Sequence, residues 1–511
     1  MDKLRVLLSA GAMLSLVAGT ANAARVLDMD GNPATVTGTG LAVGADGFPE
    51  MGGPYTGSQG LEGEGAVPFS VPQPGKVNAR INVFVNEFPM AAWWTGMSGT
   101  PTVAGTTGNK QQSYGIYGWI RLDFGLDGMT KTGVKYGGFV EIRENNTTAI
   151  SGGTASLVSV AQTAPAPATG FAGSSVTSGF AQSASGDSGD NTLYVRHANV
   201  YVGTDQFGFL RIGTGLGSQT LYETGLFDDF DIGGWISFSS SNIAGNATPV
   251  WPWADEGAAY MAARIQYVSP VIDGFDFGVD FAPNNSTPFD GSGCSAGGGG
   301  VGCATQSSST LAADYSTRYR NEIGGAIRYR NTFGPVGMAA NIGWTHSGTV
   351  GNASASPTQY YNGLDIGDAG LLVQFNKQIE VGGNIMWGAI NGNWGLKPAG
   401  GKDAFAWVSG VKWTIPQLPA TLGAYYFNYK YQGTTSGVGA ANAGAFNTQR
   451  TSQGLDVAAV YGFGPGVVAI VEYAWGQVYQ GNVNLLSGAV GSAAYNTVTA
   501  NVVTAGLSVR F

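Results

Sequence analysis

The sequence predicts an all-β chain that crosses a membrane as an antiparallel β-barrel. Three features of the 511-residue chain lead to this fold class. Runs of about 8 to 14 residues alternate apolar and polar side chains, as strands do with lipid on one face and water on the other. Glycine is abundant, with 83 residues, whereas only 11% of the residues are charged. Short connections between the runs alternate with long ones, which is typical of membrane barrels.

The first segment, residues 1–23, is predicted to be a cleaved signal peptide. Lys3 and Arg5 give it a positive start, an apolar run follows over residues 6–18, and residues 21–23 (Ala-Asn-Ala) match the small-x-small pattern of a cleavage site. The apolar run is too short to cross a bilayer core of about 30 Å as a helix. The chain is therefore expected to be exported.

The remainder of the chain divides into an extension and a barrel. Residues 24–75 are rich in Gly and Pro and show no alternation, so we expect an N-terminal extension whose role the sequence does not indicate. Residues 76–511 are expected to form the barrel, and they contain no run of about 20 apolar residues that could cross a bilayer as a helix. We predict about sixteen strands, an even number as in bacterial barrels, at 76–86, 113–124, 133–143, 192–202, 207–214, 259–268, 274–282, 318–331, 335–346, 363–377, 379–389, 403–414, 420–431, 453–463, 466–478 and 496–511.

The connections between these strands are alternately short and long. Residues 203–206 and 332–334 are short turns, whereas residues 144–191 and 283–317 are long segments rich in Ser, Gly, Ala and Asn. Short periplasmic turns opposite long outer loops are the rule for outer-membrane barrels. A soluble β-sandwich would show no such strict alternation of loop length.

One face of the predicted strands must line water. In the run from residue 318 to 331, Ile323 and Ile327 lie on the face opposite five charged side chains. A charge that faces lipid at mid-bilayer costs about 2–4 kcal/mol, so a face with five charges belongs in a hydrated lumen. These charged residues are Arg318, Arg320, Glu322, Arg328 and Arg330.

Three stretches resemble known outer-membrane proteins. The last predicted strand, 496–511, alternates and ends on Phe511, and is similar to the C-terminal signature of Gram-negative outer-membrane barrels. Residues 200–213 (VYVG, then FGFLRIG) resemble a strand–turn–strand block of the Gram-negative general porin family. Residues 264–277 (RIQYVSP, then GFDF) resemble the Tyr-x-Ser-Pro turn of that family and the strand behind it.

The resemblance implies a homotrimeric porin of sixteen strands with an inward-folded third loop that constricts the lumen. Here that loop is 215–258, which contains no Lys or Arg. Its expected acidic side is Glu223, Asp228, Asp229 and Asp231, with Asp255 and Glu256 further along the loop. In the family an arginine cluster on strands two, four and six faces this loop, and the corresponding residues, together with one on the first strand, are Arg121, Arg196, Arg264 and Arg80. The Pro-Glu-Phe-Gly-Gly loop motif of many members is absent, and residues 230–234 echo it only loosely.

Acidic groups on one side of a narrow water column and guanidinium groups on the other would create a transverse field that favours polar solutes and biases ion selectivity. Arginine suits such a wall because it stays charged in any local environment. The expected function is therefore an outer-membrane porin, a water-filled channel for passive diffusion of small polar solutes and ions. Its expected partners are small hydrophilic solutes, outer-membrane lipid and lipopolysaccharide, and two further copies of the chain.

Several other functions are disfavoured by the sequence. The formal net charge of −9 argues against a nucleic-acid partner, which would need a basic stripe. Cys294 and Cys303 lie in a Gly-rich loop and are expected to form a disulfide after export. The two histidines, His197 and His346, lie elsewhere, so neither a metal site, nor a cofactor, nor a catalytic centre is predicted.

Alternatives to a general porin stay open from the sequence. Residues 251–253 (Trp-Pro-Trp) within the third loop could stack on sugars, which would suit a channel selective for sugars or carboxylates. A non-conducting surface or adhesin barrel is a second alternative. Ion preference is also open, because the negative net charge and the lumen arginines act in opposite directions.

Overall fold

A computed structural model of the chain describes 35–36 and 42–43 and most of the chain from residue 74. The described ranges after that point are 74–96, 113–145, 193–226, 249–253, 262–284, 305–306, 319–349, 351–352, 361–376, 378–392, 394–433, 448–464, 467–486, 491–492 and 494–510. The predicted signal peptide and the two cysteines lie outside these residues.

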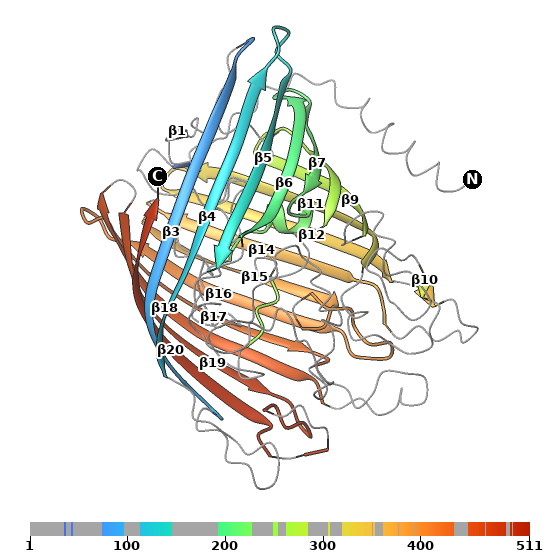
Figure 1. The fold of residues 1–511 in the computed structure, drawn as a ribbon, viewed down its shortest axis with the longest axis vertical. Coiled ribbons are helices and arrows are strands. Elements are labelled where there is room, and N and C mark those ends of the chain that lie inside the picture. The colour runs from blue at the N-terminus through green and yellow to red at the C-terminus, as the bar shows by residue number, and fades with distance from the viewer. Residues whose placement is uncertain are drawn as a thin grey trace, which may run out of the picture.

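Sixteen strands of the described residues form one closed antiparallel barrel (Figure 1). The last strand pairs with the first, and β9 pairs with β11, so the ring has no open edge. The predicted fold class and strand number are confirmed. The strands are β3 (Val77–Trp94), β4 (Tyr114–Met129), β5 (Lys135–Asn145), β6 (Leu193–Thr204), β7 (Gly208–Thr214), β8 (Ala263–Val268), β9 (Phe275–Asn284), β11 (Tyr319–Phe333), β12 (Val336–Thr349), β14 (Asp365–Phe375), β15 (Ile379–Ala389), β16 (Ala404–Thr414), β17 (Ala420–Tyr431), β18 (Arg450–Gly464), β19 (Val467–Tyr479) and β20 (Thr497–Arg510).

Two further pairs of short strands lie outside the barrel wall. β1 (Thr35–Val36) pairs with β2 (Ala42–Val43) in the N-terminal extension. β10 (Thr305–Gln306) pairs in parallel with β13 (Gly351–Asn352), and so links two of the long loops. No helix of the described residues is long and apolar enough to cross a membrane.

The first barrel strand is longer than the sequence pattern predicts. The alternation predicts an end at residue 86, whereas β3 continues to Trp94. Beyond residue 86 the polarity of the two faces inverts: Glu87 points outward and is exposed, and Phe88 points inward and is only 1% exposed. The pattern therefore fails where the lumen itself becomes apolar.

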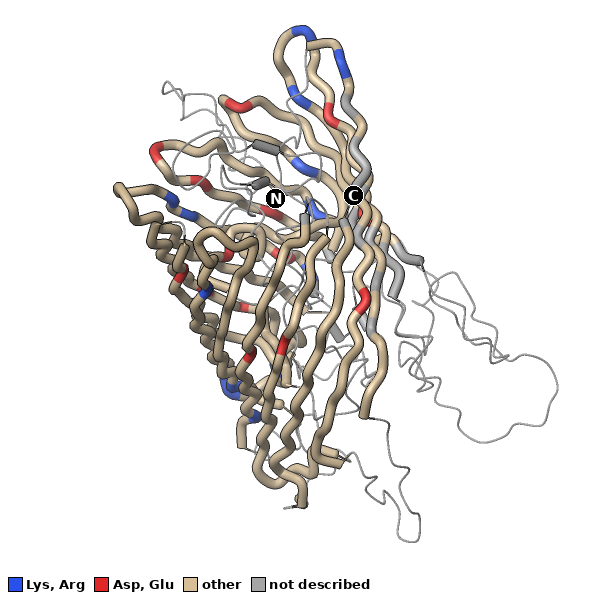
Figure 2. Tube along the Cα trace, turned by 90° about the vertical axis from the view of Figure 1, so that its left-hand side faces the viewer, with Lys and Arg blue, Asp and Glu red and all other residues tan. Residues whose placement is uncertain are grey.

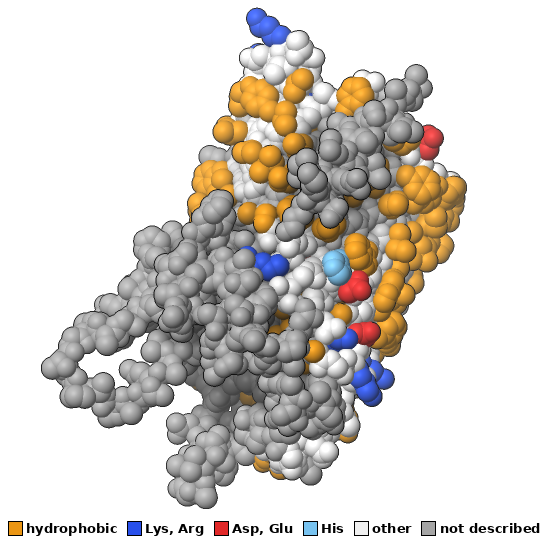
Figure 3. Space-filling model, turned by 90° about the vertical axis from the view of Figure 1, so that its right-hand side faces the viewer, with side chains coloured by type: hydrophobic (Ala, Val, Ile, Leu, Met, Phe, Trp, Pro, Cys, Tyr) orange, Lys and Arg blue, Asp and Glu red, His pale blue; other side chains and the backbone are white. Residues whose placement is uncertain are grey.

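The outer surface of the barrel is apolar. Exposed aliphatic and aromatic side chains alternate with buried ones along the strands, for example Val471 and Tyr473 in β19. Hydrophobic side chains gather in patches on the face shown in Figure 3. In Figure 2, long stretches of the strands nearest the viewer carry no charged residue. Such a surface suits hydrocarbon, because each exposed charge there would be costly.

The inner surface has two different halves. From β4 to β11 the inward side chains are largely polar or charged, and those that are buried include Asp127, Glu141, Arg211, Arg264, Asp276, Asp280, Glu322 and Arg328. From β15 to β20 many inward side chains are apolar, and these include Met386, Val408, Tyr425, Phe427, Ile470, Val478, Val498 and Val502. The third loop is held between these two halves.

Candidate functional site: a constriction formed by the third loop

The chain turns into the barrel after β7. The residues 215–225 are all buried, and they include the short helix α3 (Ser218–Tyr222). α3 packs against the inner faces of β9, β11 and β12. The third loop is therefore folded inward, as the resemblance implies.

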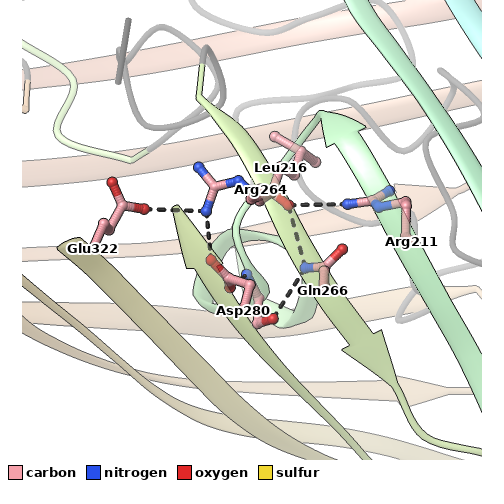
Figure 4. A network of polar contacts seen from close by, with 7 residues as sticks. Arg211, Leu216, Arg264, Gln266, Asp280 and Glu322 are labelled. Carbon is pink, nitrogen blue, oxygen red and sulfur yellow. Dashed lines mark hydrogen bonds and ion pairs between the residues drawn. The ribbon is translucent and has the colours of Figure 1, made fainter. Parts of the chain in front are cut away.

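The base of the loop is held by polar side chains of the wall (Figure 4). The carbonyl oxygen of Leu216 accepts a hydrogen bond of 2.9 Å from the Arg211 guanidinium and one of 3.2 Å from the Gln266 amide. Asp280 accepts a hydrogen bond of 2.5 Å from the backbone N–H of Ser218. Three neighbouring strands, β7, β8 and β9, thus supply the groups that the first turn of the loop requires.

Arg264 lies at the centre of this network and is paired with two carboxylates of the wall. Its Nη1 is 2.6 Å from Asp280 Oδ1 and 3.1 Å from Glu322 Oε1. All three side chains are at most 3% exposed. A buried charge is tolerated only when it is paired and hydrogen-bonded. The network therefore holds β8, β9 and β11 together at this height of the barrel.

A second set of charges holds the end of α3. The Tyr222 hydroxyl donates a hydrogen bond of 2.9 Å to the Phe277 carbonyl, and the Arg328 guanidinium lies 4.8 Å from the centre of the Tyr222 ring. Arg328 and Arg330 both pair with Asp276, at 2.5 and 3.1 Å. Burial raises the pKa of Tyr222, which keeps its hydroxyl available as a donor.

The next residues of the loop lie directly against the wall at β12, β14 and β15. The backbone N–H and the hydroxyl of Thr224 donate to Asn341 Oδ1 at 2.9 and 2.8 Å, and Asn384 Nδ2 donates to the Thr224 carbonyl at 3.1 Å. Asn341 in turn donates a hydrogen bond of 2.5 Å to the fully buried carboxylate of Asp368. Two amides and one acid thus form a polar anchor for the segment that follows α3.

The close approach at this anchor depends on a glycine. Gly225 has a φ of +80°, and a Cβ added there would lie 2.2 Å from the Gly383 carbonyl oxygen. Only glycine combines this backbone conformation with that contact. Gly225 is therefore required where this segment of the loop meets β15.

The returning part of the loop is held by aromatic packing. Trp251 lies 5.0 Å from Phe427 and 4.5 Å from Trp253, measured between ring centres. Trp253 Nε1 donates a hydrogen bond of 2.8 Å to Asn384 Oδ1. Both tryptophans are at most 1% exposed, so they pack the loop onto β15 and β17 and offer no open platform for a sugar.

The predicted acidic side of the constriction is described only in part. Glu223 directly follows α3 and is 1% exposed. The other acidic residues of the loop, Asp228, Asp229, Asp231, Asp255 and Glu256, lie outside the described residues. Cys294 and Cys303 lie outside them as well.

The predicted basic wall is also described unevenly. Arg264 faces the lumen, where its partners are acids of the wall. Arg80 and Arg121 occupy β3 and β4, but their side chains lie outside the described part of the chain. Arg196 is the extra residue of a β-bulge in β6, because the β5 register passes from His197 to Val195 without a partner for it. Its side chain is likewise outside the described part.

The sequence pattern misses most of the anchoring residues. Asp276 and Asp280 alternate with exposed Phe275, Phe277 and Phe281 in β9, so strand parity could have placed them in the lumen. Nothing in the pattern distinguishes Asn341 and Asn384 from other inward polar residues, because their roles depend on contacts with a loop over 100 residues away.

The chain matches known proteins at two levels. A family model described as Gram-negative porin matches residues 10–479. Among solved structures, an anion-selective porin from Comamonas acidovorans is 14% identical, with a TM-score of 0.48, and the match covers 85% of this chain and 100% of that chain. A triple mutant of the Rhodopseudomonas blastica porin is 13% identical, with a TM-score of 0.41 and the same coverage. No curated protein sequence matches the chain.

Proposed function

Since this chain belongs to the Gram-negative porin family, which forms outer-membrane channels, we propose that small polar solutes and ions diffuse passively through a lumen narrowed by its third loop. The inward-folded loop is the observation that carries the proposal. Among the described residues of the loop, the first turn, the segment at Thr224 and the returning segment at Trp253 are each held against the wall. A loop held at three points narrows the passage permanently, which suits a size filter better than a gate.

The charge arrangement at the throat is part of the same proposal. Glu223 and the aspartates 228, 229 and 231 form the acidic side, and Arg80, Arg121, Arg196 and Arg264 form the basic side. Support for the acidic side comes from Glu223, which lies where the loop leaves α3. Arg264 contributes to the basic side mainly as the partner of Asp280 and Glu322, so its free charge toward the water column is reduced.

A swelling assay with proteoliposomes tests passive diffusion. Liposomes that contain the protein should swell in solutions of uncharged sugars at rates that fall smoothly with solute size. The initial rate should rise linearly with solute concentration. Saturation of the rate for one sugar, or a sugar faster than smaller ones, would instead assign a substrate-selective channel. The absence of swelling for every solute would contradict a channel and support a surface barrel.

We also propose that three copies of the chain associate in the membrane. Support comes from an apolar groove of about 580 Å³ on the outward face of β4 to β7, beside the short strands β7 and β8. A hollow in this apolar surface can receive side chains of a neighbouring copy. The groove is lined by outward residues that include Phe124, Leu126, Val140, Val200 and Ile212.

The proposal includes export and processing of the chain. Residues 1–23 would be removed, residues 24–75 would remain as an extension, and the outward face of residues 76–511 would contact membrane lipid, including lipopolysaccharide. An intact mass that begins at Ala24 for protein purified from outer membranes would support the cleavage site. A mass that retains Met1 would contradict it.

A further inference from the structure

The two strands that close the barrel end at different heights on the side of the short turns. The last pair between β20 and β3 is Arg510 opposite Phe84. β3 starts seven residues earlier, and its residues from Val77 to Val83 pair with β4 alone among the described strands. In Figure 1 this part of β3 continues well past the end of the chain marked C. The closed wall therefore has a step at its rim, where one edge of β3 is free.

The free edge presents a row of backbone donors and acceptors. The Lys76 carbonyl accepts a hydrogen bond of 3.3 Å from the Met129 N–H at the end of β4. The backbone groups of successive residues in a strand point alternately to its two sides. The N–H and C=O groups that point to the free edge are therefore those of residues 77, 79, 81 and 83.

This edge lies in an apolar part of the outward face. Val77, Leu126 and Phe124 are 55%, 54% and 38% exposed, and the exposed Lys76 and Lys131 follow only at the strand ends. The free edge spans about 15 Å of height, at about 3.3 Å per residue and a tilt of about 40°. A backbone N–H or C=O without a partner is costly next to lipid, because no water satisfies it. The edge therefore requires a further strand to cover it.

The chain reverses its direction directly before β3. From Val77 onward it runs antiparallel to β4, whereas Pro74 forms a parallel bridge with Met129. The chain at Pro74 thus runs opposite to β3. Gly75 has a φ of +77°, and an added Cβ would meet only Lys131 Cγ, at 4.0 Å, so the backbone conformation alone favours glycine. Three-residue loops that end on a left-handed glycine are a common connection between antiparallel strands.

The residues before this turn have the composition of an edge strand. Residues 66–72 read Ala-Val-Pro-Phe-Ser-Val-Pro, so that Val67, Phe69 and Val71 alternate with prolines and a serine. Proline is tolerated in an edge strand where its nitrogen faces away from the neighbouring strand. The run is too short and too rich in proline to predict a strand by itself. The free edge of β3 supplies the second observation.

The prolines agree with one register of pairing. A three-residue loop over 73–75 places Val71 opposite Val77 and Phe69 opposite Ala79. The apolar side chains then share the outward face of β3, and the N–H groups of the same residues point to its free edge. The nitrogens of residues 68 and 72 point away from β3. A two-residue loop would instead bring Pro72 opposite Val77, where a donor is needed.

We propose that residues 66–72 form an additional strand that pairs with the free edge of β3 and completes the barrel wall at its rim. Only three residues separate this segment from β3, so the tether gives it a high effective concentration at the edge. Part of the N-terminal extension is thereby fixed to the wall. The proposal goes beyond the channel function and concerns the wall alone.

Hydrogen exchange of single backbone amides tests the proposal. The processed full chain in lipid nanodiscs is followed by mass spectrometry with fragmentation of the peptide that covers residues 77–83. The amides of residues 77, 79 and 81 should exchange about tenfold more slowly in the wild type than in a variant that lacks residues 24–72, because pairing protects them. Phe69→Pro, which removes an N–H that points to β3, should accelerate their exchange by a similar factor.

Ser70→Pro is the matched control, because the nitrogen of residue 70 points away from β3 in the proposed register. It should leave the exchange unchanged. The amides of residues 78, 80 and 82, which point to β4, should stay slow in every variant and so show that the barrel is folded. Equal exchange at residues 77, 79 and 81 in the wild type and the deletion variant, or equal effects of the two proline variants, would overturn the proposal.

A neighbouring copy is the alternative occupant of the edge. Protection that survives the deletion but is lost in Val200→Arg, a substitution in the outward groove, would overturn the proposal in favour of contact between copies. Conductance of the same preparations shows separately whether a channel is formed. A conducting barrel with an unprotected edge would therefore contradict the additional strand and leave the proposed channel function in place.

Discussion

Asn384 of β15 links the outgoing and the returning segments of the third loop. Its Oδ1 accepts a hydrogen bond of 2.8 Å from Trp253 Nε1 in the returning segment. Its Nδ2 donates a hydrogen bond of 3.1 Å to the Thr224 carbonyl in the outgoing segment. One buried wall amide therefore sets the position of both the outgoing and the returning chain. We expect substitutions here to alter the channel without altering the barrel strands themselves.

Asn384→Leu should loosen the loop and increase current fluctuations. The substitution leaves the Thr224 carbonyl and the Trp253 N–H unsatisfied, at a cost of about 1–3 kcal/mol for each buried group. Single-channel recording should show more open-channel noise and more frequent partial closures than in the wild type. Gln374→Leu is the control, because Gln374 bonds to Glu380 on the wall and not to the loop. Records from Asn384→Leu that match the control would disprove the anchoring role.

Arg264→Met should destabilise the barrel strongly. Removal of one partner from a buried charge network costs about 3–5 kcal/mol, because Asp280 and Glu322 remain buried without their cation. The midpoint of heat-induced unfolding, followed by the mobility shift on unboiled gels, should fall by several degrees. The double variant Arg264→Met/Glu322→Gln should recover part of this loss. Two single effects that simply add would contradict coupling between the two residues.

Gly225→Ala should displace the loop from the wall. The new Cβ would meet the Gly383 carbonyl oxygen at 2.2 Å in addition to adopting a positive φ. Gly334→Ala is the matched control, since Gly334 has a φ of +64° but no atom within 4 Å of an added Cβ. We expect Gly225→Ala to change the single-channel conductance, whereas Gly334→Ala should reduce only stability, by about 1 kcal/mol. Equal conductance in both variants would contradict the prediction that the close contact between Gly225 and Gly383 sets the position of the loop.

Val200→Arg should separate the copies of the proposed trimer. Val200 lies in the outward groove and is 58% exposed in the single chain. The matched control is Val457→Arg on β18, outside the groove and 44% exposed. Both substitutions bring a charge to the lipid face, at a cost of up to about 4 kcal/mol, but only the first should abolish oligomers on native gels. Loss of oligomers in both, or in neither, would argue against association through the groove.

The barrel could be predicted from the sequence because the alternation is local. The bounds of β15 and β17 agree with the predicted runs, 379–389 and 420–431. The prediction fails at Glu87 in β3, where apolar residues face the lumen and the pattern that marks an inner wall disappears. The alternation of apolar and polar residues identifies the inner face of a strand only where the lumen is lined by polar side chains.

The site could be predicted less fully. The resemblance to porins predicts the inward course of the loop, and strand parity predicts that Arg264 faces the lumen. Its carboxylate partners could not be identified, because the pairing of Arg264 with Glu322 depends on the register across β8, β9 and β11. The anchor at Asn341 is 117 residues from Thr224 in the chain. Such contacts follow from closure of the barrel and not from local pattern.

Single-channel current in a planar bilayer under a KCl gradient tests the central claim most directly, that the third loop forms the throat of the channel. The wild type is compared with Asp228→Asn/Asp229→Asn/Asp231→Asn, which removes three negative charges of the loop. We expect ohmic conductance in both, with the reversal potential of the variant shifted toward anion selectivity, because fixed charge at the narrowest point controls ion preference. Conductance with an unchanged reversal potential would show that the acidic loop does not form the narrowest point of the channel. An absence of conductance would contradict the proposal that the protein forms a channel.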